Sequence, residues 1–171
     1  SGAVLETGCV YLVPLIENLN LPKEITGAAN PKSSTGRIDV FVRMVTDGAD
    51  RFDLAPAGYS GPLYVEISPR TFSILAREGD RLLQLRLRRG HHQPTREITF
   101  SVDLKPGNDD IAGYRAKRHC GVLDLMRVGQ HAVEDFWEPV RPHRGSIILD
   151  PGEFYILASK EIVVIPVMEA A

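Results

Sequence analysis

The sequence predicts an all-β body of the barrel or jelly-roll kind. Glycine and proline recur along the chain, 15 and 12 times in 171 residues, and they divide the apolar segments into short pieces. Several of these pieces alternate apolar and polar residues with a period of two, which is the pattern of a strand with one buried face. Short strands separated by turns in this way are typical of antiparallel barrels and jelly rolls.

The clearest alternation lies at residues 40–42, 63–67 and 83–87, and each of these segments is predicted to be a strand. Two continuous apolar stretches, at 9–15 and 162–167, have the pattern of strands that are buried on both faces. One short helix is predicted around residues 132–136. We therefore expect helix in only a small minority of the residues.

The composition is that of an ordinary globular protein, with 43% apolar and 25% charged residues. A net charge of −2 does not favour binding to nucleic acid, and no apolar run approaches the roughly 18 residues of a membrane span. Cys9 and Cys120 lack any metal-binding spacing and are expected to be reduced, buried side chains. These features predict a cytoplasmic protein without a nucleic-acid or membrane partner.

An internal repeat relates the beginning of the sequence to its end. A Leu, a Gly and a Tyr recur together 144 residues further along (149 minus 5), and an apolar residue followed by Pro keeps the same offset. Two strands that are alike by chance are one explanation, and a tandem duplication is the other. The matching pairs are Leu5 and Leu149, Gly8 and Gly152, Tyr11 and Tyr155, and Pro22 and Pro166.

A duplication predicts two domains of the same kind. Residues 1–93 would form the first copy without its N-terminal segment, and residues 94–171 the opening part of a second, incomplete copy. The linker between them is predicted at 90–93, where His91 and His92 are expected to be solvated rather than metal-bound. A metal site would need further ligands at suitable spacing, and none lies nearby in the sequence.

A polar loop at residues 30–37 carries three hydroxyl groups and two cationic side chains just before a predicted strand. Hydroxyls and turn amides donate hydrogen bonds to phosphate oxygens, while Lys and Arg neutralise the charge. The loop is therefore a candidate polyphosphate site, although solvated loops without a ligand often have this composition. Its candidate binding residues are Lys32, Ser33, Ser34, Thr35, Gly36 and Arg37.

Glu66 lies in a predicted strand and shares one face with Tyr64, opposite the face of Leu63, Val65 and Ile67. A carboxylate beside an aromatic ring in a pocket suits general acid–base catalysis. The alternative is an ordinary solvated strand residue. A third segment, residues 79–85, is a turn leading into a strand with Gln84 on its polar face, and by itself it has the pattern of a hairpin return.

Together these segments resemble the superfamily of dUTP pyrophosphatases and dCTP deaminases. Residues 32–37 are similar to its Arg-Ser-Ser-x-x-Arg loop, with Lys32 in place of the first Arg. Residues 79–85 are similar to its Gly-Asp-Arg-Ile-Ala-Gln-Leu motif. Residues 51–61 resemble its hairpin, lengthened here at 54–56. The resemblance implies a dUTPase-like distorted barrel, followed by a partial second copy.

The strand that follows the hairpin favours the dCTP deaminase branch. Tyr64-Val65-Glu66 falls on the Val-Leu-Glu that supplies the catalytic carboxylate of dCTP deaminases, whereas the pyrophosphatases have no acid there. The resemblance implies hydrolytic deamination of dCTP to dUTP and ammonia without zinc, because the zinc-deaminase signature is absent. Glu66, Arg37 and Ser33 are the implied catalytic residues.

The resemblance also implies how the nucleotide would be bound. The loop would hold phosphates that carry Mg²⁺, Asp53 would bind the sugar, and the backbone at 64–66 would contact the base. The protein would be a homo-oligomer, a trimer in the pattern of this superfamily, with sites between subunits. The implied nucleotide-binding residues are Lys32, Ser33, Ser34, Thr35, Gly36, Arg37, Asp53, Tyr64, Val65, Glu66 and Gln84.

Two other functions stay open from the sequence. Pyrophosphatases use a hairpin aspartate to activate water, so Asp53 is compatible with a dUTP pyrophosphatase. A catalytically silent nucleotide-binding or assembly module would keep the same fold. The chain matches neither the N-terminal strand nor the C-terminal lid of the dCTP deaminases, so we expect a complete site to need further residues.

Overall fold

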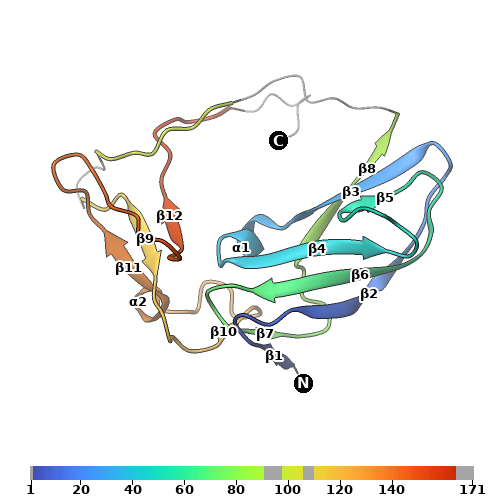
Figure 1. Cartoon of the computed structure of the whole chain (residues 1–171), viewed down its shortest axis with the longest axis horizontal. Coiled ribbons are helices and arrows are strands. Elements are labelled where there is room, and N and C mark those ends of the chain that lie inside the picture. Colours follow the sequence, from blue (N-terminus) through green and yellow to red (C-terminus); the bar gives the residue numbers. More distant parts are fainter. Residues whose placement is uncertain (1, 91–97, 106–109, 165–171) are drawn as a thin grey trace. The chain divides into compact units, whose positions relative to one another are not determined.

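The computed structural model describes residues 2–90, 98–105 and 110–164, and in this part of the chain the regular structure consists almost entirely of strands (Figure 1). The only helices among the described residues are two of four residues each, α1 (Ser33–Gly36) and α2 (Val133–Phe136). The all-β prediction is therefore confirmed, and α2 confirms the short helix predicted around 132–136. In the described part of the chain, no helix is long and apolar enough to cross a membrane.

The chain divides into two compact units that interleave along the sequence. The first unit comprises Ser1–Gln93 and Arg118–Phe136, and the second comprises Pro94–Lys117 and Trp137–Ala171. The predicted domains, 1–93 and 94–171, do not include this return of the chain to the first unit. The predicted linker at 90–93 lies outside the described residues, apart from Gly90.

The central sheet of the first unit has the strand order β2-β6-β4, from β2 (Tyr11–Asn20), β6 (Ser60–Pro69) and β4 (Val40–Thr46). In Figure 1 the green β6 runs between the cyan β4 and the blue β2. The predicted alternation is confirmed, because the apolar side chains of the inner face are almost fully buried. Burial of each such side chain stabilises the fold by about 1.5–3 kcal/mol. The buried inner residues are Val40, Val42, Met44, Leu63, Val65 and Ile67.

A second sheet has the order β5-β3-β8, from β5 (Leu54–Ala55), β3 (Ile25–Pro31) and β8 (Leu83–Arg89). The inserted residues of the hairpin thus form β5, and Ala55 is completely buried. Tyr59 also packs in this part of the core, where its hydroxyl donates to the Pro62 carbonyl at 2.5 Å. A Cβ atom at Gly61 would lie 2.9 Å from that hydroxyl, so any larger residue here would force the Tyr59 side chain to shift.

A third sheet, β1-β7-β10, connects the returning segment to the first unit, from β1 (Ala3–Leu5), β7 (Ile74–Ala76) and β10 (Leu123–Asp124). Arg77 donates two hydrogen bonds to the carboxylate of Asp124, and Phe72 packs edge-on against Phe136 at 5.7 Å between ring centroids. The ion pair with Arg77 lowers the pKa of Asp124 to about 2, chiefly through the side-chain hydrogen bond that Arg77 donates.

The second unit contains the sheet β11-β9-β12, from β11 (Trp137–Val140), β9 (Gly113–Ala116) and β12 (Tyr155–Leu157). A Cβ atom at Gly113 would lie 2.1 Å from the Ile156 carbonyl oxygen, so only glycine allows β9 and β12 this close. Arg115 and Glu138 face each other across β9 and β11 and form an ion pair at 2.5 Å.

The sequence repeat corresponds to a shared local structure before β2 and β12. The amide of Glu6 donates to the Tyr11 hydroxyl at 2.9 Å, and the amide of Asp150 donates to the Tyr155 hydroxyl at 3.1 Å. Gly8 and Gly152 both take a positive φ, +81° and +74°. The likeness becomes weaker after these turns, because β2 spans ten residues and β12 only three.

Three expectations about burial were wrong. Val10 and Leu12 are each 65% exposed, although a strand buried on both faces was predicted at 9–15. The reason is that β2 is the edge strand of its sheet and its outer face is uncovered in the described chain. Ile162 and the two residues after it are in no strand, and residues 165–167 lie outside the described residues. Cys9 is exposed rather than buried.

Candidate functional site

The polar loop is anchored by its backbone and by one buried threonine. Lys32 donates its amide to the Leu82 carbonyl at 2.9 Å, and the Thr35 hydroxyl donates to the same carbonyl at 3.1 Å. Thr35 is only 3% exposed, so its side chain is an anchor and does not reach the surface. The other predicted loop residues, Lys32, Ser33, Ser34, Gly36 and Arg37, are exposed.

The short helix α1 pairs two of the predicted catalytic residues. Arg37 Nη2 donates to Ser33 Oγ at 2.7 Å, across one turn of the helix. The register of β3 with β8 places Asn30 opposite Gln84 and Pro31 opposite Leu83, which brings Gln84 to the end of β3 from which the loop begins. We call Lys32, Ser33, Ser34, Arg37 and Gln84 the loop group; all five are exposed.

Glu66 lies in the middle of β6, and its side chain points to the outer face of the central sheet with 21% exposure. Its carboxylate oxygen Oε1 accepts hydrogen bonds from Arg43 Nε at 3.1 Å and from Arg43 Nη2 at 2.6 Å. Tyr64, which is half-buried, lies two residues earlier on the same face. The predicted face of Glu66 is thus confirmed, and its partner in the fold is an arginine of β4.

Two exposed aromatic rings flank that arginine. The guanidinium carbon of Arg43 lies 3.6 Å from the centroid of the Phe52 ring and 5.2 Å from that of Phe41. Phe52 is 49% exposed and Phe41 is 47% exposed, so about half of each side chain is open to solvent. We call Phe41, Arg43, Phe52 and Glu66 the carboxylate group.

Asp53 holds the hairpin against β4. Its Oδ1 accepts the Met44 amide at 2.7 Å, and its own amide donates to the Met44 carbonyl at 2.9 Å. The residue takes a left-handed φ of 61°, which Asp tolerates better than most residues because its side chain can bond to nearby backbone. One carboxylate oxygen is therefore committed to the fold.

The backbone at residues 64–66 belongs to the central strand of its sheet. Glu66 is paired with Leu12 on one side and with Arg43 on the other. The pairing with β2 is interrupted between Pro14 and Asn18, next to the end of this segment. Base recognition by this backbone stays a prediction, and the sheet surface presents the side chains of Tyr64 and Glu66.

The predicted residues belong to two different sheets of the fold. The loop group is attached to the sheet β5-β3-β8, while Asp53, Tyr64 and Glu66 belong to the central sheet and its hairpin. Arg37, which was expected to hold Glu66, is bonded to Ser33, and Arg43 holds Glu66. Sequence analysis missed Arg43. The alternation at 40–46 places it on the polar side, but only the β4–β6 register identifies its partner.

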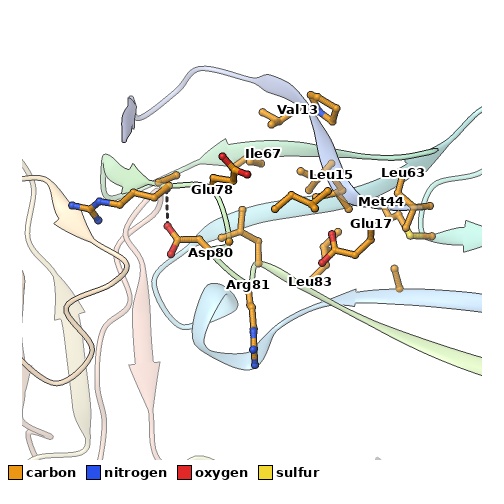
Figure 2. Close-up of a pocket in the computed structure, with 18 of the residues that line it drawn as sticks. Val13, Leu15, Glu17, Met44, Leu63, Ile67, Glu78, Asp80, Arg81 and Leu83 are labelled. Atoms are coloured by element: carbon orange, nitrogen blue, oxygen red, sulfur yellow. Dashed lines mark hydrogen bonds between the residues drawn. The ribbon is translucent and has the colours of Figure 1, made fainter. Parts of the chain in front are cut away.

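A large apolar cavity lies on the other side of the central sheet. Its volume is about 1000 Å³, and inner-face residues such as Leu15, Met44 and Leu63 line it (Figure 2). At its rim Asp80 accepts the Arg77 amide at 2.7 Å, and Arg81 extends away from the apolar side chains. Its lining contains neither Glu66 nor the residues of the loop group, so the cavity is separate from the candidate site.

The described residues contain no group of three or more His, Cys, Asp or Glu side chains that could hold a metal ion. The loop group itself offers cations, hydroxyls and an amide. Such donors suit an anionic ligand, whereas Mg²⁺ is held through carboxylate and phosphate oxygens.

Fold and site together define an all-β protein with a candidate anion-binding loop and a positioned carboxylate. Residues 1–91 match the family model described as 2'-deoxycytidine 5'-triphosphate deaminase (DCD) N-terminal domain, and residues 72–171 match the model of the C-terminal domain. The chain belongs to the dCTP deaminase family.

One solved structure is similar to this chain over nearly its whole length. It is the crystal structure of 2'-deoxycytidine 5'-triphosphate deaminase from Agrobacterium tumefaciens, with 50% sequence identity and a TM-score of 0.91. The match covers 96% of this chain and 56% of that one, so this chain spans little more than half of that protein's length. No curated protein sequence matches the chain.

Proposed function

We propose that the protein deaminates dCTP, converting dCTP and water to dUTP and ammonia. The observation that carries this proposal is Glu66, a carboxylate that a double hydrogen bond holds on an open sheet face beside two exposed aromatic rings. Membership of the dCTP deaminase family and the 50% identity to a solved dCTP deaminase support the choice of substrate.

In the proposed reaction Glu66 moves protons between water and the cytosine ring. Its carboxylate takes a proton from the attacking water as the oxygen bonds to C4, and it gives that proton to ring N3. The new C4 hydroxyl then loses its proton through Glu66 to the amino nitrogen, the C4–N bond breaks, and ammonia leaves as the C4 carbonyl forms. A positioned acid–base group of this kind contributes about 10²–10⁴-fold in rate.

The loop group would hold the triphosphate. Lys32 and Arg37 supply positive charge, and the hydroxyls of Ser33 and Ser34 donate to phosphate oxygens. Mg²⁺ bound to the triphosphate would neutralise part of its charge, with the phosphates rather than the protein as its main ligands. The loop at residues 32–37 directly precedes β4, and β4 carries Phe41 and Arg43 of the carboxylate group. This arrangement suits a ligand with an anionic end and a planar base.

We propose that the protein acts as a homo-oligomer, most simply a trimer. The exposed apolar side chains of β2 support this, because a second copy would remove Leu12 and Ile16 from water. The mass of the purified protein in solution, measured by light scattering, tests it directly. A cytoplasmic location stays an expectation based on composition.

The two other functions make different predictions. A dUTP pyrophosphatase would need the Asp53 carboxylate to activate water, and one oxygen of that carboxylate already accepts the Met44 amide. A silent binding module would bind dCTP without turnover.

Liquid chromatography of dCTP and dUTP after incubation with the protein and Mg²⁺ distinguishes the three functions. The deaminase predicts dUTP and an equal amount of ammonia from dCTP. Release of dUMP and pyrophosphate from dUTP would identify a pyrophosphatase. Unchanged nucleotides, together with measurable dCTP binding, would identify a silent module.

A further inference from the structure

Arg43 is held from two directions at once. The edge of its guanidinium group donates twice to Glu66 Oε1, and a face of the same group lies over the Phe52 ring at 3.6 Å. Arginine can do both because its guanidinium is planar, with donors around the edge and a face that stacks on aromatic rings. Lysine carries the same charge but has neither the planar face nor two donors in a fixed geometry.

The hairpin determines where the Phe52 ring lies. Asp53, the next residue, makes two hydrogen bonds to the backbone of Met44, and Met44 follows Arg43 in β4. The hairpin is thus bonded to the strand at the position beside Arg43. Contacts therefore run in series from Asp53 through Phe52 and Arg43 to the carboxylate of Glu66.

We propose that Arg43, stacked on Phe52, is the positioning residue of Glu66. This inference rests on the proposed deamination and adds to it a residue that holds the proton-transfer group in place. Both donors of Arg43 engage one oxygen, Oε1, which leaves the second oxygen, Oε2, as the one that would accept the proton from water.

The geometry gives Arg43 a role in the rate rather than in binding. A proton-transfer group must be held within a fraction of an ångström of its place, and a misplacement of about 1 Å costs up to about 10²-fold in rate. Glu66 is 21% exposed and has rotatable bonds, so without Arg43 its carboxylate would sample several orientations. Arg43 does not itself touch the reacting atoms in this account.

Steady-state kinetics of dCTP deamination test the role. Arg43→Gln should lower kcat by about 10- to 100-fold and change KM by less than about threefold. The kcat of Arg43→Lys should be higher than that of Arg43→Gln but lower than that of the wild-type protein. Phe52→Leu should lower kcat by about two- to fivefold in the wild-type protein and have no further effect in the Arg43→Gln background, because it acts through Arg43. Arg115→Gln is the matched control, since it breaks a similar cross-strand Arg–Glu pair in the second unit, and it should leave kcat unchanged.

Wild-type kcat in Arg43→Gln or Arg43→Lys would overturn the positioning role. So would a Phe52→Leu effect that is confined to KM and persists in the Arg43→Gln background, because Phe52 would then contact the base directly.

Nuclear magnetic resonance of the Arg43 Nε–Hε group gives a readout that does not require turnover. The ring current of Phe52 should shift this resonance in the wild-type protein, and both Phe52→Leu and Glu66→Gln should move it. A resonance that neither variant moves would show that the contact is absent in solution, and the inference would fail by itself. If both variants move it while the wild-type protein forms no dUTP, the proposed function has failed and the positioning role fails with it.

Discussion

Replacing Glu66 by glutamine removes the proposed proton carrier and changes little else. Glutamine keeps the size of the side chain and an oxygen that can accept both donors of Arg43. The lost ion pair is partly exposed, with 32% of the Arg43 side chain and 21% of the Glu66 side chain accessible, so the free energy of unfolding should fall by less than about 1 kcal/mol. A domain with roughly 5–15 kcal/mol of stability stays folded after such a loss.

The expected catalytic loss is larger than the loss of stability. Without a proton carrier kcat should fall by at least about 100-fold, which corresponds to about 2.7 kcal/mol of transition-state stabilisation. Binding of dCTP should stay within a few-fold, because glutamine still fills the site. The assay is formation of dUTP from dCTP with Mg²⁺, followed by chromatography, alongside thermal unfolding of each variant.

Glu138→Gln provides the matched control, because Glu138 faces Arg115 across a strand pair as Glu66 faces Arg43. It should unfold at a similar temperature to Glu66→Gln and keep full activity. Deamination by Glu66→Gln at a rate close to that of the wild-type protein would refute the assignment of Glu66.

Three other predictions concern the phosphates, the sugar and pH. Lys32→Ala should raise KM for dCTP by about tenfold and leave kcat nearly unchanged, because a charge-assisted phosphate contact of about 1.5 kcal/mol is lost; a fall in kcat alone would contradict this role. Asp53→Asn keeps an acceptor for the Met44 amide, so the protein should fold and lose mainly affinity for the sugar; lost pyrophosphate release from dUTP would instead favour the pyrophosphatase. The pKa of Asp124 is lowered from 3.8 to about 2 by Arg77, so the stabilisation from this pair is present above pH 3.8 and is lost as pH falls through 2. Urea unfolding should show a wild-type advantage over Asp124→Asn that is constant at neutral pH and shrinks across this interval.

The sequence pattern predicted most of the central sheet. Alternation within a strand follows directly from which face is buried, so Val42, Val65 and Ile67 could be assigned to the core without knowledge of their neighbours. The face of Glu66 follows from the same argument. The predicted loop residues also lie together at the surface, apart from Thr35, because an anchoring hydroxyl and a ligand-binding hydroxyl look alike in sequence.

Long-range pairing could not be predicted from the pattern. The contact of Arg43 with Glu66 depends on the register between β4 and β6, because the two residues are 23 positions apart in the sequence. Arg37 matched a known motif, whereas Arg43 did not. The return of Arg118–Phe136 to the first unit depends on a parallel pairing and on the Arg77–Asp124 pair, neither of which has a local signal. The apolar stretch at 9–15 has the pattern of a strand that is buried on both faces. No described part of the chain covers its outer face, so the burial predicted from the pattern alone was wrong.

The destination of the water oxygen tests the central claim most directly. When dCTP is incubated with the protein and Mg²⁺ in water enriched in ¹⁸O, attack at C4 places the label in the uracil ring of dUTP and none in phosphate. Mass spectrometry of the nucleotide and of its separated base distinguishes the two positions. The account predicts one ¹⁸O atom in the base for each ammonia released. Label in a phosphate group, with an unlabelled base, would contradict it.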